Sequence, residues 1–109
     1  LKNFMFRPCR FMPTFSVHQG RTCGGAQIFY TGGKFSPTET AYRIIQYLKK
    51  TYPQTKWTYH GYHYTIDALA GTDRMRKFIE EGKSFEEFRK ELLPGVKRYE
   101  TTRNKYLLY

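Results

Sequence analysis

Two short segments have the form that begins an α-helix, and they organise the rest of the chain. In residues 36–39 (SPTE), a serine precedes a proline at the first helical position and a glutamate at the third. Such a serine and glutamate each satisfy a free backbone N–H group at the start of a helix. Residues 84–87 (SFEE) repeat the pattern. At least two helices are therefore expected after residue 36.

Apolar residues follow both starts with a helical period. The first helix is expected to end before Pro53, and the last to bend or break at residues 94–95 (PG) before it resumes up to residue 104. Between them, a short helical turn ended by Gly71 and a further helix stopped by Gly82 are expected. The YLLY ending is apolar enough to dock. The predicted inward residues are Ala41, Ile44, Ile45 and Leu48, then Met75, Phe78 and Ile79, then Phe85, Phe88 and Leu92.

The first third of the chain is expected to form strands. Residues 9–16 are rich in aromatic side chains, and Pro13 makes them an edge strand or an interrupted one. Residues 25–31 (GAQIFYT) alternate, so that the even-numbered residues share one face. Residues 17–24 connect the two strands. We therefore predict an α+β fold, a small β-sheet packed by about three helices, in a single domain of residues 1–109.

The composition favours an anionic partner but does not indicate which kind. The net charge is +10, from 19 Lys and Arg against 9 Asp and Glu. This charge fits nucleic acid or another anionic polymer, and it equally fits a solvated basic surface. The basic residues are scattered, and no apolar run is long enough for a membrane span. The chain starts at Leu1 without a signal-peptide pattern, so we expect a fragment of a longer protein.

Residues 13–25 (PTFSVHQGRTCGG) gather reactive residue types, but their spacing matches no catalytic motif. A zinc site formed by His18, His60 and His63 lacks the usual ligand spacing. Cys23 leads into a strand, whereas activated thiols lie at helix N-termini or beside cations, so a packing role is favoured over a Cys23–His18 nucleophile. Whether Cys9 and Cys23 form a disulfide stays open. No pair of carboxylates suits glycoside hydrolysis, and no cofactor motif is present.

Three longer patterns occur in a fixed order: FRPxxFxPTFxxHxGxxCxGxQ at residues 6–27, IDALAGTDRMRKFIEEG at residues 66–82, and RxKYLLY at residues 103–109. Together they resemble the C-terminal part of the exo-β-N-acetylmuramidase family, which are bacterial glycoside hydrolases. The resemblance implies a larger, Rossmann-like N-terminal domain that carries the catalytic carboxylate and packs against this one. Those enzymes release terminal N-acetylmuramic acid from peptidoglycan fragments, in the cell envelope or outside the cell.

The resemblance also assigns roles to individual residues. It makes His18 the first choice for a sugar contact. By their chemistry, Arg10, Arg21 or His18 could receive the lactyl carboxylate of N-acetylmuramic acid, and Tyr30 could stack on a sugar face. The isolated chain would be inactive and would hold no catalytic residue, metal or cofactor. Within the second pattern, a helix cap and its ion pair are expected. The motif positions expected to be structural are Pro13, Thr14, Gly20, Cys23, Gly25, Asp67, Gly71 and Arg74.

Two other readings stay open. A basic module rich in aromatic residues could bind single-stranded nucleic acid by stacking its bases. The chain could also be a purely structural interface domain without ligand contact. Trp57, Tyr59 and Tyr62 are further candidates for stacking on sugar faces, or for packing in a core or domain interface.

Overall fold

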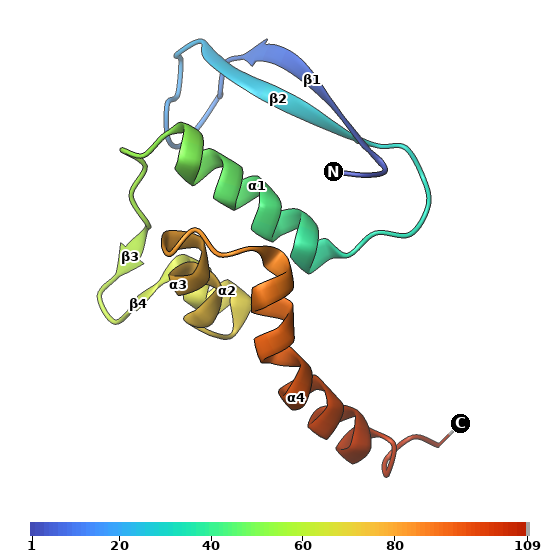
Figure 1. The fold of residues 1–109 in the computed structure, drawn as a ribbon. Helices are drawn as coiled ribbons and strands as arrows, with labels where there is room; N and C mark the ends of the chain where they lie inside the picture. The colour runs from blue at the N-terminus through green and yellow to red at the C-terminus, as the bar shows by residue number, and fades with distance from the viewer. Residues whose placement is uncertain (109) are drawn as a thin grey trace. The chain divides into compact units, whose positions relative to one another are not determined.

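The computed structural model describes residues 1–108 (Figure 1). The predicted α+β fold is confirmed, with helices and two-stranded antiparallel sheets in those residues. The chain divides into two compact units, unit 1 (Leu1–Pro37) and unit 2 (Thr38–Tyr109). The elements are β1 (Phe4–Phe11), β2 (Cys23–Tyr30), α1 (Pro37–Thr51), β3 (Tyr59–His60), β4 (His63–Tyr64), α2 (Thr65–Ala70), α3 (Arg74–Glu80) and α4 (Phe85–Arg103).

Unit 1 is a hairpin in which β1 pairs with β2 from Phe4 opposite Tyr30 to Phe11 opposite Cys23. The prediction for β1 was wrong by five residues, since the strand starts at residue 4 rather than 9. It ends two residues before Pro13, which has no N–H group for the ladder. The prediction for β2 was closer, and its even-numbered residues share one face as expected.

Aromatic rings close both ends of the hairpin. At the loop end, a Cβ added to Gly25 would lie 2.8 Å from Cε1 of Phe11, so the ring packs where only glycine leaves room. At the open end, the rings of Phe4, Tyr30 and Phe35 lie with their centroids 5.1–5.7 Å apart. These contacts hold the register of the hairpin from both ends.

Unit 1 nevertheless has no core of its own. None of its residues is buried, and Met5, Phe6, Phe11, Phe15 and Ile28 are exposed. A two-stranded hairpin alone is marginally stable in water. The apolar residues of this hairpin are therefore suited to being covered by a further surface.

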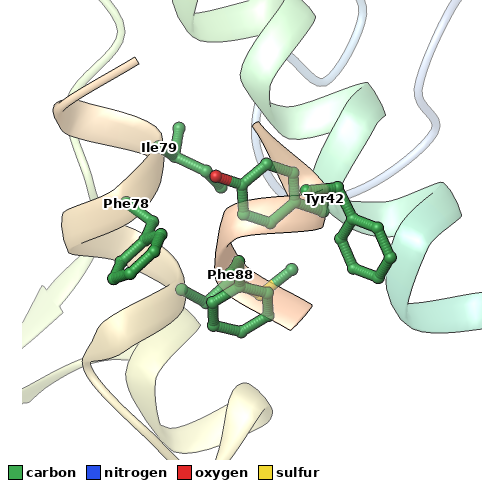
Figure 2. Close-up of a cluster of buried hydrophobic side chains, with 6 residues drawn as sticks. Tyr42, Phe78, Ile79 and Phe88 are labelled. Carbon is green, nitrogen blue, oxygen red and sulfur yellow. The ribbon is translucent and has the colours of Figure 1, made fainter. Parts of the chain in front are cut away.

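Unit 2 has an aromatic core between α1, α3 and α4 (Figure 2). The rings of Tyr42 and Phe88 stack with centroids 5.3 Å apart. The inward residues predicted for α3 and α4 are confirmed, but the stripe predicted for α1 was partly wrong. Tyr42 is buried instead of Ala41 and Leu48 because its hydroxyl donates to the carbonyl of Lys83 at 2.8 Å, which satisfies its polar tip. The buried residues are Tyr42, Met75, Phe78, Ile79, Phe85 and Phe88.

The predicted ends of the helices agree with the structure in most places. α1 starts at Pro37 and ends before Pro53. α2 ends at Gly71, whose φ of 68° is the left-handed conformation that glycine adopts without strain. The reciprocal cap of α4 is present, since the Ser84 hydroxyl accepts from the Glu87 backbone and the Glu87 carboxylate accepts from the Ser84 backbone.

Of the bend or break predicted at residues 94–95, the break was wrong, because α4 runs through Pro94 to Arg103. The N–H that Pro94 lacks would bond the carbonyl of Lys90, and Lys90 is exposed, so water can reach that carbonyl. The docking predicted for the YLLY ending is also wrong for residues 106–108, whose side chains are exposed. Tyr109 lies outside the described residues. In the part of the chain that the structure describes, no helix is both long and apolar enough to cross a membrane.

The cap of α4 predicts a loss of stability in acid. The backbone N–H and hydroxyl of Ser84 hydrogen-bond the Glu87 carboxylate and lower its pKa in the folded state. The stabilisation that the ionised Glu87 carboxylate gives to the folded state is therefore complete above the ordinary glutamate pKa of about 4.3. It is lost as the pH falls through the lowered pKa of Glu87 in the folded state. Urea unfolding of the wild-type chain should show this loss below about pH 4.3, relative to its stability at about pH 6. Because glutamine keeps the cap without titrating, Glu87→Gln should show a smaller loss, and an equal loss would contradict the prediction.

Candidate functional site

The connection between β1 and β2 is a compact loop rather than an extended one. The backbone N–H of Gly20 donates to the carbonyl of Pro13 at 3.0 Å, which ties the two sides of the loop together. Two further backbone hydrogen bonds form turns in this loop. Gln19 N–H donates to the Ser16 carbonyl, and Arg21 N–H donates to the His18 carbonyl. The loop therefore holds its residues in a defined backbone conformation.

His18 has a backbone conformation that is uncommon for a residue with a side chain. Its φ is 62°, and that of Ser16 is 63°. Non-glycine residues in this left-handed region carry local strain and concentrate at functional sites. The His18 side chain is also exposed. The loop thus presents an accessible imidazole on a strained backbone.

The charge of unit 1 has a single sign. Its sequence contains no aspartate or glutamate. Arg10 lies one residue before the end of β1, and Arg21 lies in the loop two residues before β2. An anionic group at this end of the hairpin would therefore meet two guanidinium groups without a competing carboxylate in unit 1. The basic residues of the unit are Lys2, Arg7, Arg10, Arg21 and Lys34.

The structure does not bring all the candidate sugar contacts together. Tyr30 pairs with Phe4 at the open end of the hairpin, whereas Arg10 pairs with Gly24 near the loop. Tyr30 lies six positions after Gly24 along β2, which is about 20 Å at 3.3 Å per residue. Tyr30 also donates its hydroxyl to the Gly33 carbonyl. Its contact with a sugar stays a prediction, and it would have to be made far from His18.

The two cysteines lie on one face of the hairpin as free thiols. Cys9 stands opposite Gly25, and Cys23 stands opposite Phe11, so the two thiols are diagonal neighbours. The Cys23 thiol lies 3.6 Å from the carbonyl of Arg21. Half-buried at the first position of β2, Cys23 has the surroundings of a packed residue.

The ion pair expected within the second motif exists, but the arginine was wrongly predicted. Asp67 binds Arg76 in a bidentate arrangement, with Arg76 Nη2 2.8 Å from Asp67 Oδ2. Arg74 instead pairs with Glu91 at 3.1 Å. Positions 74 and 76 are about 200° apart around a helix, so they point to opposite sides. The side chains of Asp67 and Arg76 are only 16% and 14% exposed, which makes this the less solvated of the two pairs.

Arg76 is also the centre of a larger network that the sequence did not reveal. Its guanidinium lies 4.1 Å from the centre of the Tyr64 ring. Glu80 lies 3.6 Å from Arg76 and accepts a hydrogen bond from Trp57 Nε1 at 2.7 Å. This chain of contacts ties the segment before β3 and the strand β4 to α3. Arg76 and Glu80 are four residues apart, a spacing that could have indicated their contact.

The imidazoles do not form a metal-binding group. His60 stands directly opposite His63 across β3 and β4. Among residues 1–108, no three side chains of His, Cys, Asp or Glu are placed to share a metal ion.

Comparison with known proteins identifies the family. The family model described as "Exo-beta-N-acetylmuramidase NamZ, C-terminal" matches residues 1–109. The chain belongs to this family. It is 34% identical over 111 residues to the protein named Peptidoglycan beta-N-acetylmuramidase NamZ from Bacillus subtilis (strain 168). That match covers 100% of this chain and 26% of the relative, so the chain spans about a quarter of the relative's length. No solved structure is significantly similar to it.

Membership of the NamZ C-terminal family bears out the resemblance on which the residue roles depend. The structure places the residues to which these roles were assigned as follows. His18, Arg10 and Arg21 gather at the loop end of unit 1, and Asp67 and Gly71 are held in unit 2 by an ion pair and a helix end. Pro13 and Gly20 close the loop through their backbone hydrogen bond, and Thr14 lies exposed between them.

Proposed function

We propose that this chain is the C-terminal domain of an exo-β-N-acetylmuramidase and that it completes the substrate cleft of a two-domain enzyme. The observation that carries the proposal is the loop end of unit 1. There His18 exposes its imidazole from a strained backbone conformation. The hairpin that carries it contains no aspartate or glutamate and has no core of its own. A surface of this kind suits contact with a further domain and with an anionic ligand. The activity proposed is that of the Bacillus subtilis relative, a peptidoglycan beta-N-acetylmuramidase.

In this proposal each residue has a chemical role. The His18 imidazole hydrogen-bonds a sugar hydroxyl, because it can both donate and accept. Arg10 or Arg21 receives the lactyl carboxylate of N-acetylmuramic acid in a charge-assisted hydrogen bond. The general acid comes from a Rossmann-like N-terminal domain, since this chain offers no convincing carboxylate pair for that chemistry. The muropeptide substrate assigns the enzyme to the bacterial cell envelope or the exterior.

The arginines give the sharpest test in the longer enzyme. Arg7 and Arg10 lie on the same strand, but an odd and an even position face opposite sides of the hairpin. Arg10→Ala is expected to lower kcat/KM on a chromogenic N-acetylmuramic acid glycoside by about tenfold or more, because one charge-assisted hydrogen bond is lost. Arg7→Ala should leave it within about twofold. The same glycoside without its lactyl group should show no difference between the two variants. If Arg10→Ala had the same kinetics as Arg7→Ala on the intact substrate, Arg21→Ala should show the loss instead, and no loss in either Arg10→Ala or Arg21→Ala would contradict the assignment.

His18→Ala and the isolated chain complete this experiment. His18→Ala should also lower kcat/KM, and unchanged kinetics would favour a purely structural interface domain. The chain of 109 residues by itself is expected to release no chromophore. Turnover by this isolated chain would show that the acid and the base lie within it, which would overturn the two-domain proposal.

A further inference from the structure

The small hairpin β3–β4 in unit 2 is an exposed aromatic element that the proposed cleft does not use. Four residues make up its strands, and the turn between them consists of Gly61 and Tyr62. Tyr62 is 94% exposed at the tip. A tyrosine so exposed contributes nothing to packing within unit 2, so its ring is free to meet a ligand.

The two faces of this hairpin have different surroundings. Tyr59 and Tyr64 pair across the strands and share one face. The Tyr64 ring on that face lies under the guanidinium of Arg76, which belongs to α3. His60 and His63 also pair, and neighbouring residues of a strand point to opposite faces. The two exposed imidazoles therefore lie side by side on the face opposite the one that carries the Arg76 contact.

The base of the hairpin is anchored well enough to present these groups in a fixed arrangement. Thr65, which follows β4, donates its N–H to the carbonyl of Thr58, which precedes β3, at 2.9 Å. The Tyr59 hydroxyl donates to the Gly61 carbonyl at 3.0 Å, which ties the strand to its own turn. Arg76 is held in turn by the bidentate pair with Asp67. A pre-organised platform loses less entropy when it binds than a flexible loop does.

The segment that forms the hairpin carries charge of a single sign, and the nearby Glu80 of α3 is engaged by Arg76 and Trp57. Residues 49–64 contain Lys49, Lys50 and Lys56 but no aspartate or glutamate. The first acid after them, Asp67, is occupied by Arg76. This segment therefore favours a ligand that carries negative charge as well as a surface for an aromatic ring.

We propose that the β3–β4 hairpin is an accessory binding site for a carboxylate-bearing saccharide chain, the chemistry of a peptidoglycan glycan strand. The Tyr62 ring stacks on a sugar face, and the paired imidazoles of His60 and His63 hydrogen-bond a carboxylate or a hydroxyl of the neighbouring sugar. The choice of a glycan as ligand rests on the proposed function. The site itself would hold the polymer and make no contact with the bond that is cleaved.

The test is co-sedimentation of the chain of 109 residues with purified insoluble peptidoglycan. Tyr62→Ala is expected to weaken binding about tenfold, and His60→Gln should weaken it by a smaller factor. Tyr106→Ala is the matched control, because this tyrosine of unit 2 is also largely exposed, at 78%. It should leave binding unchanged. All three variants should keep the wild-type unfolding midpoint, since the substituted side chains are exposed.

The outcomes separate this site from the proposed function. Binding that is equal in Tyr62→Ala and wild type would overturn the accessory site, even if the longer enzyme cleaves its glycoside normally. Loss of binding in Tyr62→Ala would support the site even if that enzyme proved inactive. If a single-stranded DNA probe bound more tightly than peptidoglycan and lost its binding in Tyr62→Ala, the hairpin would be a nucleic-acid site and the saccharide assignment would be wrong.

Discussion

Replacing Phe88 by alanine is expected to lower the free energy of unfolding of unit 2 by about 3–5 kcal/mol. The Phe88 side chain is only 2% exposed. Its ring contacts those of Tyr42, Phe78 and Phe85, which come from α1, α3 and α4. Its removal would leave a cavity among three helices. Because domains of this size are stable by about 5–15 kcal/mol, the variant should lose a large part of its helical circular dichroism at moderate urea concentrations.

The matched control for Phe88→Ala is Phe15→Ala in the loop of unit 1. Phe15 is 77% exposed, so the same change of residue should alter the free energy of unfolding by less than about 0.5 kcal/mol. If both variants unfolded at the wild-type urea midpoint, the aromatic cluster would not be the core of unit 2.

Arg76→Ala is expected to lower the free energy of unfolding by about 2 kcal/mol, a value between those measured for exposed and for buried ion pairs. The substitution leaves the Asp67 carboxylate largely shielded from solvent without its bidentate partner. It also removes the guanidinium over the Tyr64 ring, so β4 loses this contact with α3. Urea unfolding would measure the cost, and hydrogen exchange of the Thr65 amide would report the loosening of the hairpin.

Arg74 provides the control for this prediction. Its pair with Glu91 is much more exposed, so Arg74→Ala should cost less than about 0.5 kcal/mol. A double-mutant cycle of Asp67→Ala and Arg76→Ala should give a coupling energy of about 1 kcal/mol or more. Equal costs for Arg74→Ala and Arg76→Ala would contradict the prediction that the less exposed pair of Arg76 contributes more to stability.

Local signals in the sequence predicted the helices of this protein well. The cap at Ser84 and the end of α2 at Gly71 depend on residues within one turn, so a pattern of four residues was enough. Pro94 was misjudged because the cost of its missing hydrogen bond depends on solvent access to the helix. That access depends on the tertiary structure and cannot be read from neighbouring residues.

The contacts between distant residues were harder to predict. Tyr42 is buried because a carbonyl forty-one residues later accepts its hydroxyl, and no local pattern contains that fact. The bounds of β1 were misplaced for a similar reason, since the pairing partner decides which residues of an aromatic stretch form the strand. In the candidate site, the loop and its histidine were predicted, whereas the separation of about 20 Å between Tyr30 and Arg10 follows only from the pairing of the strands.

The position of Trp57 has a consequence for spectroscopy. It is the only tryptophan of the chain, it packs against the core of unit 2, and it lies between Lys49 and Glu80 two residues before β3. Intrinsic fluorescence from this indole would report both the melting of the aromatic core and the occupation of the neighbouring hairpin. It would carry no local signal from unit 1, which has no tryptophan. A tryptophan introduced at exposed Phe15 would give the loop around His18 an emission of its own.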